Sequence, residues 1–453
     1  MLLGFTANNN TIMGLLQFVQ RTLGFGRTAP PPLVGLRAPA LVAPKARPAV
    51  ATPRPAPDTL GLGTLLLREE MLDHRGRLAG HRIGLRASAS PQDYLQALQS
   101  SQVQRQAERR WVLIDLPTAM ATAWIDGDWR SLVQEHTVFQ LRPAPSLHDT
   151  MVAMKAQGAG VALAWTGDTP EPTEHWALAS HAILSLRQTP LEEVERRMQH
   201  LRQHHPALQI VVQDVETWAE QRLCVAQGAM LVMGAFLSTA DNHVRNEALP
   251  PGRLCLMEML QALRQDADTA VMADLAKHDP GVAVQLLSMV NSPAFGLAQP
   301  LSSLEQALTM LGREALYRWL SVSLFKGGED RPHDLALLEM ALTRARFMEQ
   351  LGLEHGAPGQ ADELFLVGLL SYVDRLLGLP LADVLSRMSA PQTVTDVLLL
   401  SQGPHAPWLL LAMAMEHCDA DRVMRIAQAQ GLPAGHFTRA RDEAVLWAAD
   451  AVH

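Results

Sequence analysis

A histidine and an aspartate stand side by side at His278–Asp279, and such a pair could ligate a divalent metal. Phosphohydrolases that activate water on a metal use imidazole and carboxylate ligands of this kind. Asp279, however, is followed by Pro280 and an apolar run, which is the pattern of a helix that begins with an aspartate cap. We therefore predict that Asp279 is a helix cap, and a phosphohydrolase that uses His278–Asp279 is the less favoured alternative.

The other metal-binding residue types lack ligand spacing. None of the three cysteines is in a CxxC pair, so neither a zinc site nor a disulfide framework is indicated. The histidines are scattered, and we interpret the adjacent His204–His205, which precede Pro206, as solvated. The sequence therefore predicts no catalytic residues, no bound metal and no cofactor.

Charge and hydropathy argue against two kinds of partner. The formal net charge is −8 over 453 residues, and residues 1–57 hold six basic residues and no acid, so the remainder is more acidic still. An acidic body repels phosphate backbones, so we expect no nucleic-acid binding. The apolar start lacks a basic segment and is interrupted by three asparagines, so we expect no membrane span. Together with the sparse cysteines, this favours a cytoplasmic location.

The chain divides into three parts by pattern. Residues 1–59 include nine prolines between positions 28 and 57 and are predicted to be a Pro/Ala-rich disordered tail and linker. Residues 60–240 alternate apolar runs with helical stretches, which predicts parallel β/α units and a barrel, complete or incomplete. Residues 250–453 show helical periodicity, with Leu254, Met257, Leu260 and Leu263 at helical spacing, and are predicted to be all-α.

Six strands and four helices are expected in the 60–240 part. The predicted strands are Leu62–Arg68, Trp111–Leu116, Thr137–Leu141, Val161–Trp165, Ala182–Leu186 and Gln209–Val212. The predicted helices are Pro91–Ala107, Ser146–Gln157, Pro190–His204 and Thr217–Gln227.

This part resembles an EAL domain, a (β/α)8 barrel that hydrolyses cyclic di-GMP with two divalent metals. The stretch LREEMLDHRGRLAGHRIGLR, residues 67–86, resembles the opening hairpin of the family, with a turn at Asp73–Gly76 and the signature arginine at Arg86. The stretch QIVVQDVET resembles a later strand, and the Val-Glu pair of the family is kept as Val215–Glu216.

The ligand positions of the resemblance are largely replaced. The substitutions are Arg82 for the signature glutamate, Asp115 for an asparagine, Gln140 for a glutamate, Trp165 and Thr166 for an aspartate pair, Ser185 for the lysine, Gln213 for a glutamate, and Met233–Gly234 for a Gln-Gly pair. Two metal ions need several anionic oxygens, so these residues cannot hold them. Only Arg86 and Glu216 remain as residual ligand contacts.

The all-α part resembles an HDOD domain. The match lies in LAKHDPGVAVQLLSMVNSPAFGLAQPLSSLEQALTMLGREAL, and its signature residues are Asp279, Pro280, Asn291, Ser292 and Gly312, with a structural or partner-binding role. HDOD domains are related to metal-dependent hydrolases without the metal site. The position of the His-Asp dyad falls in the segment 368–374, where Ser371 and Tyr372 are poor metal ligands.

The sequence therefore predicts a degenerate EAL-like barrel followed by an HDOD domain. The resemblance implies a bacterial signalling scaffold that is not an enzyme and that acts by protein–protein recognition in a cyclic di-GMP network. Its expected partner is an unidentified signalling protein, and the sequence leaves the oligomeric state open. Two alternatives remain, a receptor that binds cyclic di-GMP without hydrolysis and an active cyclic di-GMP phosphodiesterase.

Overall fold

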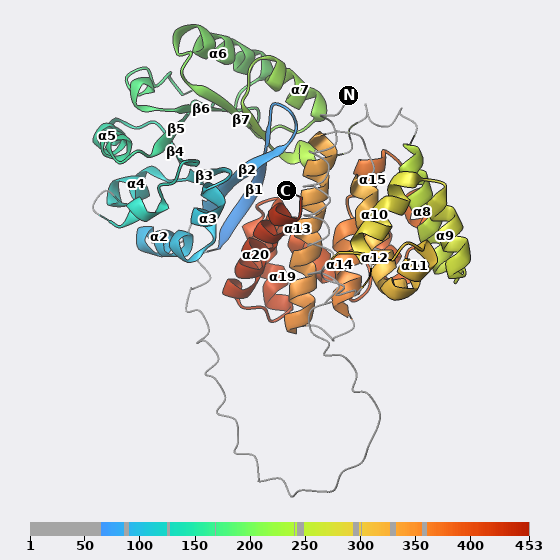
Figure 1. Ribbon diagram of the computed structural model, residues 1–453. Helices are drawn as coiled ribbons and strands as arrows, with labels where there is room; N and C mark the ends of the chain where they lie inside the picture. Colours follow the sequence, from blue (N-terminus) through green and yellow to red (C-terminus); the bar gives the residue numbers. More distant parts are fainter. Residues whose placement is uncertain are drawn as a thin grey trace, which may run out of the picture.

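The computed structural model describes residues 65–452, apart from gaps at 86–89, 125–126, 168, 240, 242–248, 293–298, 300, 327–331 and 356–359. The predicted tail and linker at 1–59 lie outside these residues. The first described part is a closed eight-stranded barrel, and helices form the second part (Figure 1). The predicted fold class, a barrel followed by an all-α region, is confirmed, and the exact domain bounds stay a prediction.

The barrel strands follow one another around the barrel in chain order. They are β1 (Leu66–Asp73), β2 (Leu78–Leu85), β3 (Trp111–Asp115), β4 (Thr137–Leu141), β5 (Gly160–Ala164), β6 (His181–Ser185), β7 (Gln209–Gln213) and β8 (Leu231–Met233). β1 runs antiparallel to both of its neighbours, β2 and β8, and the remaining neighbours are parallel. The hairpin between β1 and β2 closes at the predicted turn, where the Gly76 amide donates to the Asp73 carbonyl.

Side chains of alternate residues point into the barrel, as the two-residue period of a strand requires. A separate apolar cluster fills the interior and is made of Met71, Leu113, Val138, Ala162, Ala164, Ile183, Val211, Leu231 and Met233. The period then places the next interior positions, Arg82, Asp115, Gln140, Ser185 and Gln213, at the carboxyl ends of the parallel strands. These are five of the positions at which the sequence comparison expected catalytic residues.

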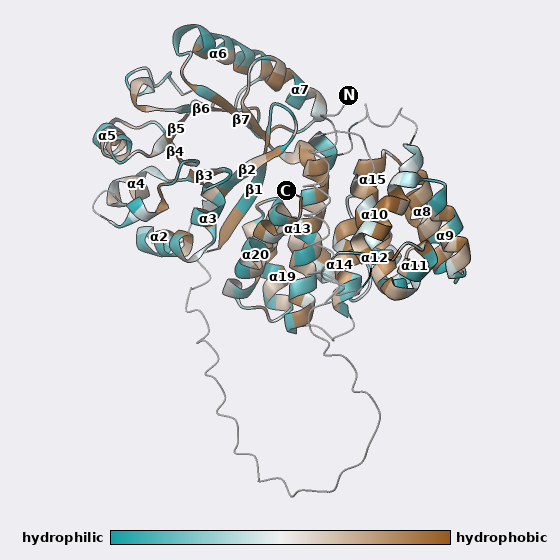
Figure 2. Cartoon of the chain, in the orientation of Figure 1, coloured by the Kyte–Doolittle hydropathy of each residue, from teal (hydrophilic) through white to brown (hydrophobic). Residues whose placement is uncertain are grey.

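Helices and short 3-10 turns cover the outside of the barrel. They are α2 (Pro91–Ser100), α3 (Val103–Ala107), α4 (Thr118–Trp124), η2 (Trp129–Leu132), η3 (Pro145–Leu147), α5 (His148–Ala156), η4 (Trp176–Leu178), α6 (Leu191–His204), α7 (Trp218–Ala226) and η5 (Ala235–Ser238). The helix predicted at 91–107 is two helices, because the chain leaves helical geometry at Ser101. The outer face of α6 is largely hydrophilic (Figure 2).

The second part is entirely helical among its described residues. Its helices are α8 (Pro251–Arg264), α9 (Thr269–Lys277), α10 (Pro280–Val290), α11 (Leu304–Leu311), α12 (Arg313–Lys326), α13 (Pro332–His355), α14 (Gln360–Leu370), α15 (Val373–Leu377), α16 (Leu381–Arg387), α17 (Gln392–Leu400), α18 (Ala406–Glu416), α19 (Ala420–Ala429) and α20 (Ala434–Val452). The long helix α13 packs against α12, α14, α18 and α20 and so forms the centre of this part. In α8, Met257, Leu260 and Leu263 are buried as expected, but Leu254 is exposed because a three-residue repeat drifts around a helix of 3.6 residues per turn.

The two parts meet along β1, which packs against α18, while α13 also contacts β2. Buried ion pairs cross this boundary. Arg68 of β1 pairs with Asp442 of α20 at 2.7 Å, and Arg110 pairs with Glu339 of α13 at 2.5 Å. Buried pairs of this kind fix register, because breaking one leaves an uncompensated charge in a low-dielectric interior. The helical part therefore covers the outer side of β1, as the outer helices cover the other strands of the barrel.

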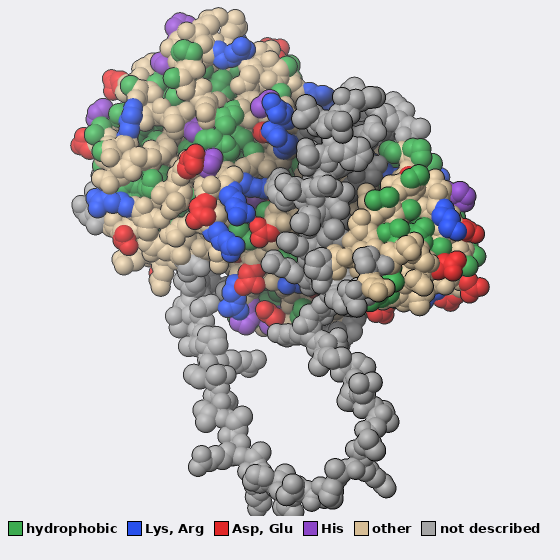
Figure 3. Space-filling view, in the orientation of Figure 1, with side chains coloured by type: hydrophobic (Ala, Val, Ile, Leu, Met, Phe, Trp, Pro, Cys, Tyr) green, Lys and Arg blue, Asp and Glu red, His purple; other side chains and the backbone are tan. Residues whose placement is uncertain are grey.

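Three further observations bear on the sequence predictions. Among the described helices, none is by itself long and apolar enough to cross a membrane, although the bent pair Gln360–Leu377 and Leu381–Arg387 passes by length and composition. Cys224, Cys255 and Cys418 are free. On the face drawn in Figure 3, described side chains of both charge signs are interspersed.

His181 lies inside the barrel at the amino ends of the strands, and its burial leads to a prediction about pH. His181 is buried there against Trp111, with ring centroids 5.2 Å apart, and burial lowers the pKa of His181 to about 4. Because the unfolded chain takes up this proton near pH 6.5, His181 costs stability as the pH falls from about 6.5 toward 4. We expect His181→Phe to reduce the stability lost over this window by up to about 3 kcal/mol, measured by denaturant unfolding at several pH values.

The matched control is His148→Phe, because His148 is an exposed histidine of the same barrel. Its pH profile is expected to follow that of the wild type. An unchanged pH profile in His181→Phe would show that His181 is not held neutral by burial.

Candidate functional site

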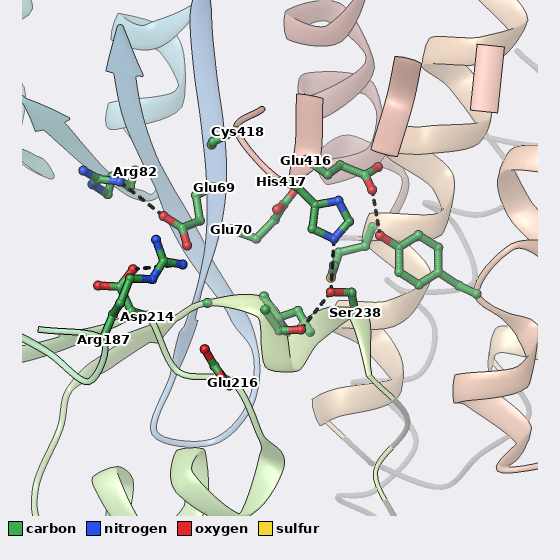
Figure 4. A pocket seen from close by; sticks show the side chains of 15 residues that line it. Glu69, Glu70, Arg82, Arg187, Asp214, Glu216, Ser238, Glu416, His417 and Cys418 are labelled. Atoms are coloured by element: carbon green, nitrogen blue, oxygen red, sulfur yellow. Dashed lines mark hydrogen bonds and ion pairs between the residues drawn. The ribbon is translucent and has the colours of Figure 1, made fainter. Parts of the chain in front are cut away.

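A pocket of about 320 Å³ opens at the carboxyl ends of the barrel strands (Figure 4). Both parts of the chain line it. The barrel contributes Glu69, Glu70, Arg82, Arg187, Asp214, Glu216, Gly234, Ala235, Leu237 and Ser238, and the helices contribute Met340, Tyr372, Glu416, His417 and Cys418. The pocket is therefore rich in charge, and its chemistry depends on how these charges are paired.

Arg82 lies at the centre of the barrel side of this pocket. Its Nη2 donates to Asp115 Oδ2 at 2.5 Å, its Nη1 to Glu69 Oε2 at 3.4 Å and its Nε to Gln140 Oε1 at 3.2 Å. Three neighbouring strands supply these partners, since Glu69 pairs with Arg82 across the β1–β2 ladder and Asp115 and Gln140 are paired residues on β3 and β4. One guanidinium therefore satisfies the acidic and amide groups of three strands.

Burial and these ion pairs act on the pKa values in opposite directions. Burial alone would lower the pKa of Arg82, but the carboxylates of Asp115 and Glu69 outweigh it and raise that pKa. Burial raises the pKa of Glu69, and the Arg82 charge offsets only part of the shift. The cation is therefore permanent, and it places a positive charge between the carboxylates of Asp115 and Glu69.

The position expected to hold a lysine is occupied by a hydroxyl group. Ser185 ends β6, and its Oγ donates to Asp214 Oδ2 at 2.5 Å. Asp214 follows β7 in a left-handed conformation, with φ of +61°, which turns its carboxylate toward the pocket. Its other oxygen lies 3.8 Å from Nη2 of Arg187, whose side chain is 73% exposed.

The remaining predicted positions contribute little to the pocket. Gln213 ends β7, and Trp165 is buried with its indole nitrogen donating to the Thr169 carbonyl. Glu216 is exposed at the rim, and Arg86 lies outside the described residues. Whether Arg86 and Glu216 act together as residual ligand contacts therefore stays a prediction.

A glycine is required at position 234, because the Val215 backbone approaches this residue closely. Its φ is +146°, and a Cβ at this position would lie 2.3 Å from the Val215 carbonyl oxygen. The β8 end and the loop after β7 are thus held in contact, which places Glu216 and the η5 turn beside the pocket.

The carboxyl end of α18 covers the pocket from the helical side. His417 Nε2 lies 3.4 Å from Ser238 Oγ of η5, and Cys418 lines the pocket beside them (Figure 4). Glu416 accepts hydrogen bonds from Arg344, Arg441 and Tyr372. Burial alone would raise the pKa of Glu416, but Arg344 and Arg441 outweigh it and lower that pKa.

The same network reaches β1. Arg441 Nη2 donates to Glu70 Oε1 at 2.8 Å, so it joins Glu70 to Glu416. Burial raises the pKa of Glu70. Because Glu69 and Glu70 are consecutive strand residues, one faces the barrel mouth and the other faces the helices.

The segment that replaces the His-Asp dyad also contacts an arginine. Arg344 Nη1 donates to Ser371 Oγ at 2.6 Å and its Nη2 to Tyr372 Oη at 2.8 Å, and the guanidinium lies 4.0 Å from the Tyr372 ring. A cation at this place repels a divalent metal. Neither this segment nor the barrel mouth fits the metals that the two related enzyme families use.

The signature residues of the helical part serve backbone structure. Asp279 caps α10 by accepting the amides of Gly281 and Val282, as predicted, and His278 is exposed. The Asn291 side-chain amide holds the Leu301 backbone, because its Nδ2 donates to the Leu301 carbonyl at 2.7 Å and its Oδ1 accepts from the Leu301 amide at 2.6 Å. Because the Asp279 side chain caps α10, the main argument for a metal site at His278–Asp279 is lost.

Two more signature residues lie at helix ends. Gly312 ends α11 with φ of +75°, a conformation that glycine adopts without strain. Ser292 is buried just after α10. Whether these residues also bind a partner stays a prediction.

Sequence reasoning missed several pocket residues. These include Glu69, Arg187 and Asp214. Asp214 directly follows Gln213 and Arg187 lies two residues after Ser185, while Glu69 lies opposite Arg82 on the β1–β2 ladder. Glu416 and Cys418 come from more than 170 positions further along the chain than any barrel residue, and no local signal connects them to the mouth.

Comparison with known proteins identifies the helical part first. Residues 249–387 match the family model described as "HDOD domain". Among curated proteins, the chain is 25% identical over 211 residues to the uncharacterized protein YuxH of Bacillus subtilis, covering 46% of this chain and 51% of that protein. It is 23% identical over 238 residues to the cyclic di-GMP phosphodiesterase CdgJ of Vibrio cholerae, covering 52% and 54%. The chain thus spans about half the length of these curated relatives.

Solved structures give a weaker likeness. One is the PaMucR phosphodiesterase in complex with cyclic di-GMP, with 15% identity, a TM-score of 0.32, and coverage of 39% of this chain and 90% of that one. Another is the YkuI protein of Bacillus subtilis, which has an EAL domain, with 10% identity, a TM-score of 0.32, and coverage of 39% and 54%.

The fold and the family match define a two-part protein with a TIM-like barrel followed by a helical domain of HDOD type. The predicted recognition is confirmed in that the helical part matches the HDOD family model and the curated relatives of the chain include a cyclic di-GMP phosphodiesterase.

The charge pairing at the mouth gives a stability prediction. Arg82→Leu removes the only described cation that contacts Asp115 and Glu69, so we expect a loss of about 2 kcal/mol or more at pH 7.5. The loss should be smaller at pH 5.5 than at pH 7.5, because burial raises the pKa of Glu69 and protonation removes the charge that Arg82 neutralises. Denaturant unfolding at both pH values measures the difference.

Arg187→Leu is the control, since Arg187 is an exposed arginine of the same mouth and should cost less than about 1 kcal/mol. Equal losses in the two variants would contradict the role given to Arg82.

Proposed function

We propose that this protein is a non-catalytic signalling scaffold in a cyclic di-GMP network, acting by protein–protein recognition. The observation that carries the proposal is the Arg82 guanidinium, which pairs with Asp115 and Glu69 at the barrel mouth. A two-metal hydrolase needs those oxygens for its ions and needs the centre of the site free of a competing cation.

The replaced lysine position adds a second, independent argument. Ser185 bonds Asp214 and offers no positive charge to a phosphate ester. A lost general-acid or electrostatic group commonly costs several powers of ten in rate, so even a weakly bound metal would leave little turnover. The link to cyclic di-GMP rests on the relatives, one of which is a cyclic di-GMP phosphodiesterase.

A receptor that binds cyclic di-GMP without hydrolysis is the second candidate. One observation favours it. Arg187 lines the pocket with a side chain that is 73% exposed and only loosely paired with Asp214 at 3.8 Å. A guanidinium in this state is available to a phosphate group. The pocket of about 320 Å³, however, is bounded by α18 on its helical side, so a dinucleotide would have to displace that helix end.

A hydrolysis assay on the full-length chain tests the catalytic question. We expect no linear product from cyclic di-GMP with Mg²⁺ or Mn²⁺, because Arg82 takes the place of the ions, whereas an active EAL phosphodiesterase run in parallel gives product. Turnover that disappears in Asp115→Ala would overturn the proposal.

Calorimetry on the same protein separates scaffold from receptor. The scaffold proposal expects no heat of binding with cyclic di-GMP. Saturable binding that Arg187→Ala weakens tenfold or more would establish the receptor function instead, with His148→Ala as the exposed-residue control.

A further inference from the structure

A second cluster of polar side chains lies on the barrel and shares no residue with the pocket. Glu171 stands in the loop after β5, while His200 and His205 lie on the last turn and at the carboxyl cap of α6. The ligand atoms of these three residues all lie within 4.8 Å of one another. α6 lies on the outer surface of the barrel, away from α20 (Figure 1). We propose that these three side chains form a binding site for one zinc-class divalent ion.

The donor set suits this class of metal. Two imidazole nitrogens and one carboxylate oxygen are borderline ligands that zinc prefers, and three protein ligands leave the fourth position for water. Magnesium and calcium, in contrast, require mostly oxygen ligands. The site is therefore distinct in chemistry from the magnesium-type site of an EAL enzyme.

The spacing between ligand atoms is close to that of a zinc tetrahedron. His200 Nε2 lies 3.1 Å from Glu171 Oε1, and His205 Nε2 lies 3.5 Å from the same oxygen. Four ligands at about 2.0–2.1 Å from a zinc ion are about 3.3–3.4 Å from one another in a regular tetrahedron. Both distances to the carboxylate oxygen are thus close to the tetrahedral value, and the two histidine ligand atoms lie within 4.8 Å of each other.

The carboxylate is also oriented by a neighbour outside the ligand set. Trp176 Nε1 donates to Glu171 Oε1 at 3.0 Å, which fixes the carboxylate toward the two histidines. Outer hydrogen bonds of this kind raise metal affinity by holding ligands in place. All three ligands are part-buried, with side-chain exposures of 20%, 36% and 29% for Glu171, His200 and His205, so an ion can reach them from solvent.

This assignment corrects one prediction from the sequence. His205 was interpreted as solvated together with His204, but it contacts Glu171. His204 remains exposed, and its Nδ1 bonds the His200 carbonyl instead of facing the cluster. The sequence did not reveal this cluster, because its carboxylate, Glu171, lies in a loop 29 residues before His200.

The test uses the full-length chain after removal of metals with a chelator. Zinc is titrated in competition with a chromogenic chelator, and we expect one equivalent per chain. Glu171→Gln, His200→Ala and His205→Ala should each weaken binding at least about tenfold. His148→Ala, an exposed histidine of the same barrel, should bind zinc as the wild type does.

A second measurement uses the wild-type chain alone, so its result does not depend on whether the variants fold. Trp165 and Trp176 lie beside the cluster, with ring centroids 6.1 Å from His200 and 5.9 Å from His205 respectively. In the wild-type chain, Co²⁺ should give the visible absorption of a tetrahedral ion and quench tryptophan fluorescence, and both signals should be displaced by zinc.

Two results would overturn the proposal. One is the absence of stoichiometric zinc or cobalt binding to the wild type. The other is binding that survives the His200→Ala/His205→Ala double variant but is lost in His436→Ala, which would place the ion at the second described cluster of Glu354, His355 and His436.

Discussion

Strand β1 carries two consecutive glutamates in opposite directions, and the arrangement of the whole molecule depends on how they are neutralised. Glu69 meets Arg82 inside the barrel mouth, and Glu70 meets Arg441 among the helices. Glu70 is buried and Glu69 is partly buried, and burial raises both pKa values, so each requires a cation nearby. The barrel cannot satisfy Glu70 alone, and the helices cannot satisfy it without β1. The two parts are thereby held as one unit.

The same device appears at both places where the related enzyme families bind metal. Arg82 holds Asp115 and Glu69 in the barrel, and Arg344 holds Ser371, Tyr372 and Glu416 in the helical part. A guanidinium supplies positive charge and several directed donors without a bound ion. Structure that metals would otherwise organise is organised here by side chains of the chain itself. The two parts thus share one arrangement, in which a guanidinium pairs with the polar groups of its site.

The sequence predicted much of this fold, for identifiable reasons. Strands β3 to β7 are short apolar runs buried on both faces, and they were located to within one or two residues. β8 has only three residues, and β2 contains Gly80, His81 and Arg82, so neither shows a clear apolar period, and they were found only through resemblance. The replacements at the expected EAL ligand positions could be predicted because those positions lie at strand ends.

The sequence predicted less of the pocket than of the fold. Its helical wall comes from the end of α18, and the pairing of Glu416 with Arg344 and Arg441 joins three helices that are distant in sequence. Only tertiary packing brings them to β1. The Glu171 cluster was hidden for the same reason, since a loop carboxylate and a helix end meet only after the barrel closes.

The balanced charge at the barrel mouth also limits how this protein can change by mutation. Replacing Arg82 with glutamate would leave three neighbouring carboxylates without a cation, and adding a carboxylate at Gln140 while Arg82 stays would leave the guanidinium outnumbered. Each single step toward a metal site therefore passes through a less stable protein, because no ion binds until several ligands are present together. Building a two-metal site at this mouth would therefore demand several coordinated substitutions, so an evolutionary path that proceeds one residue at a time meets a barrier at its first step.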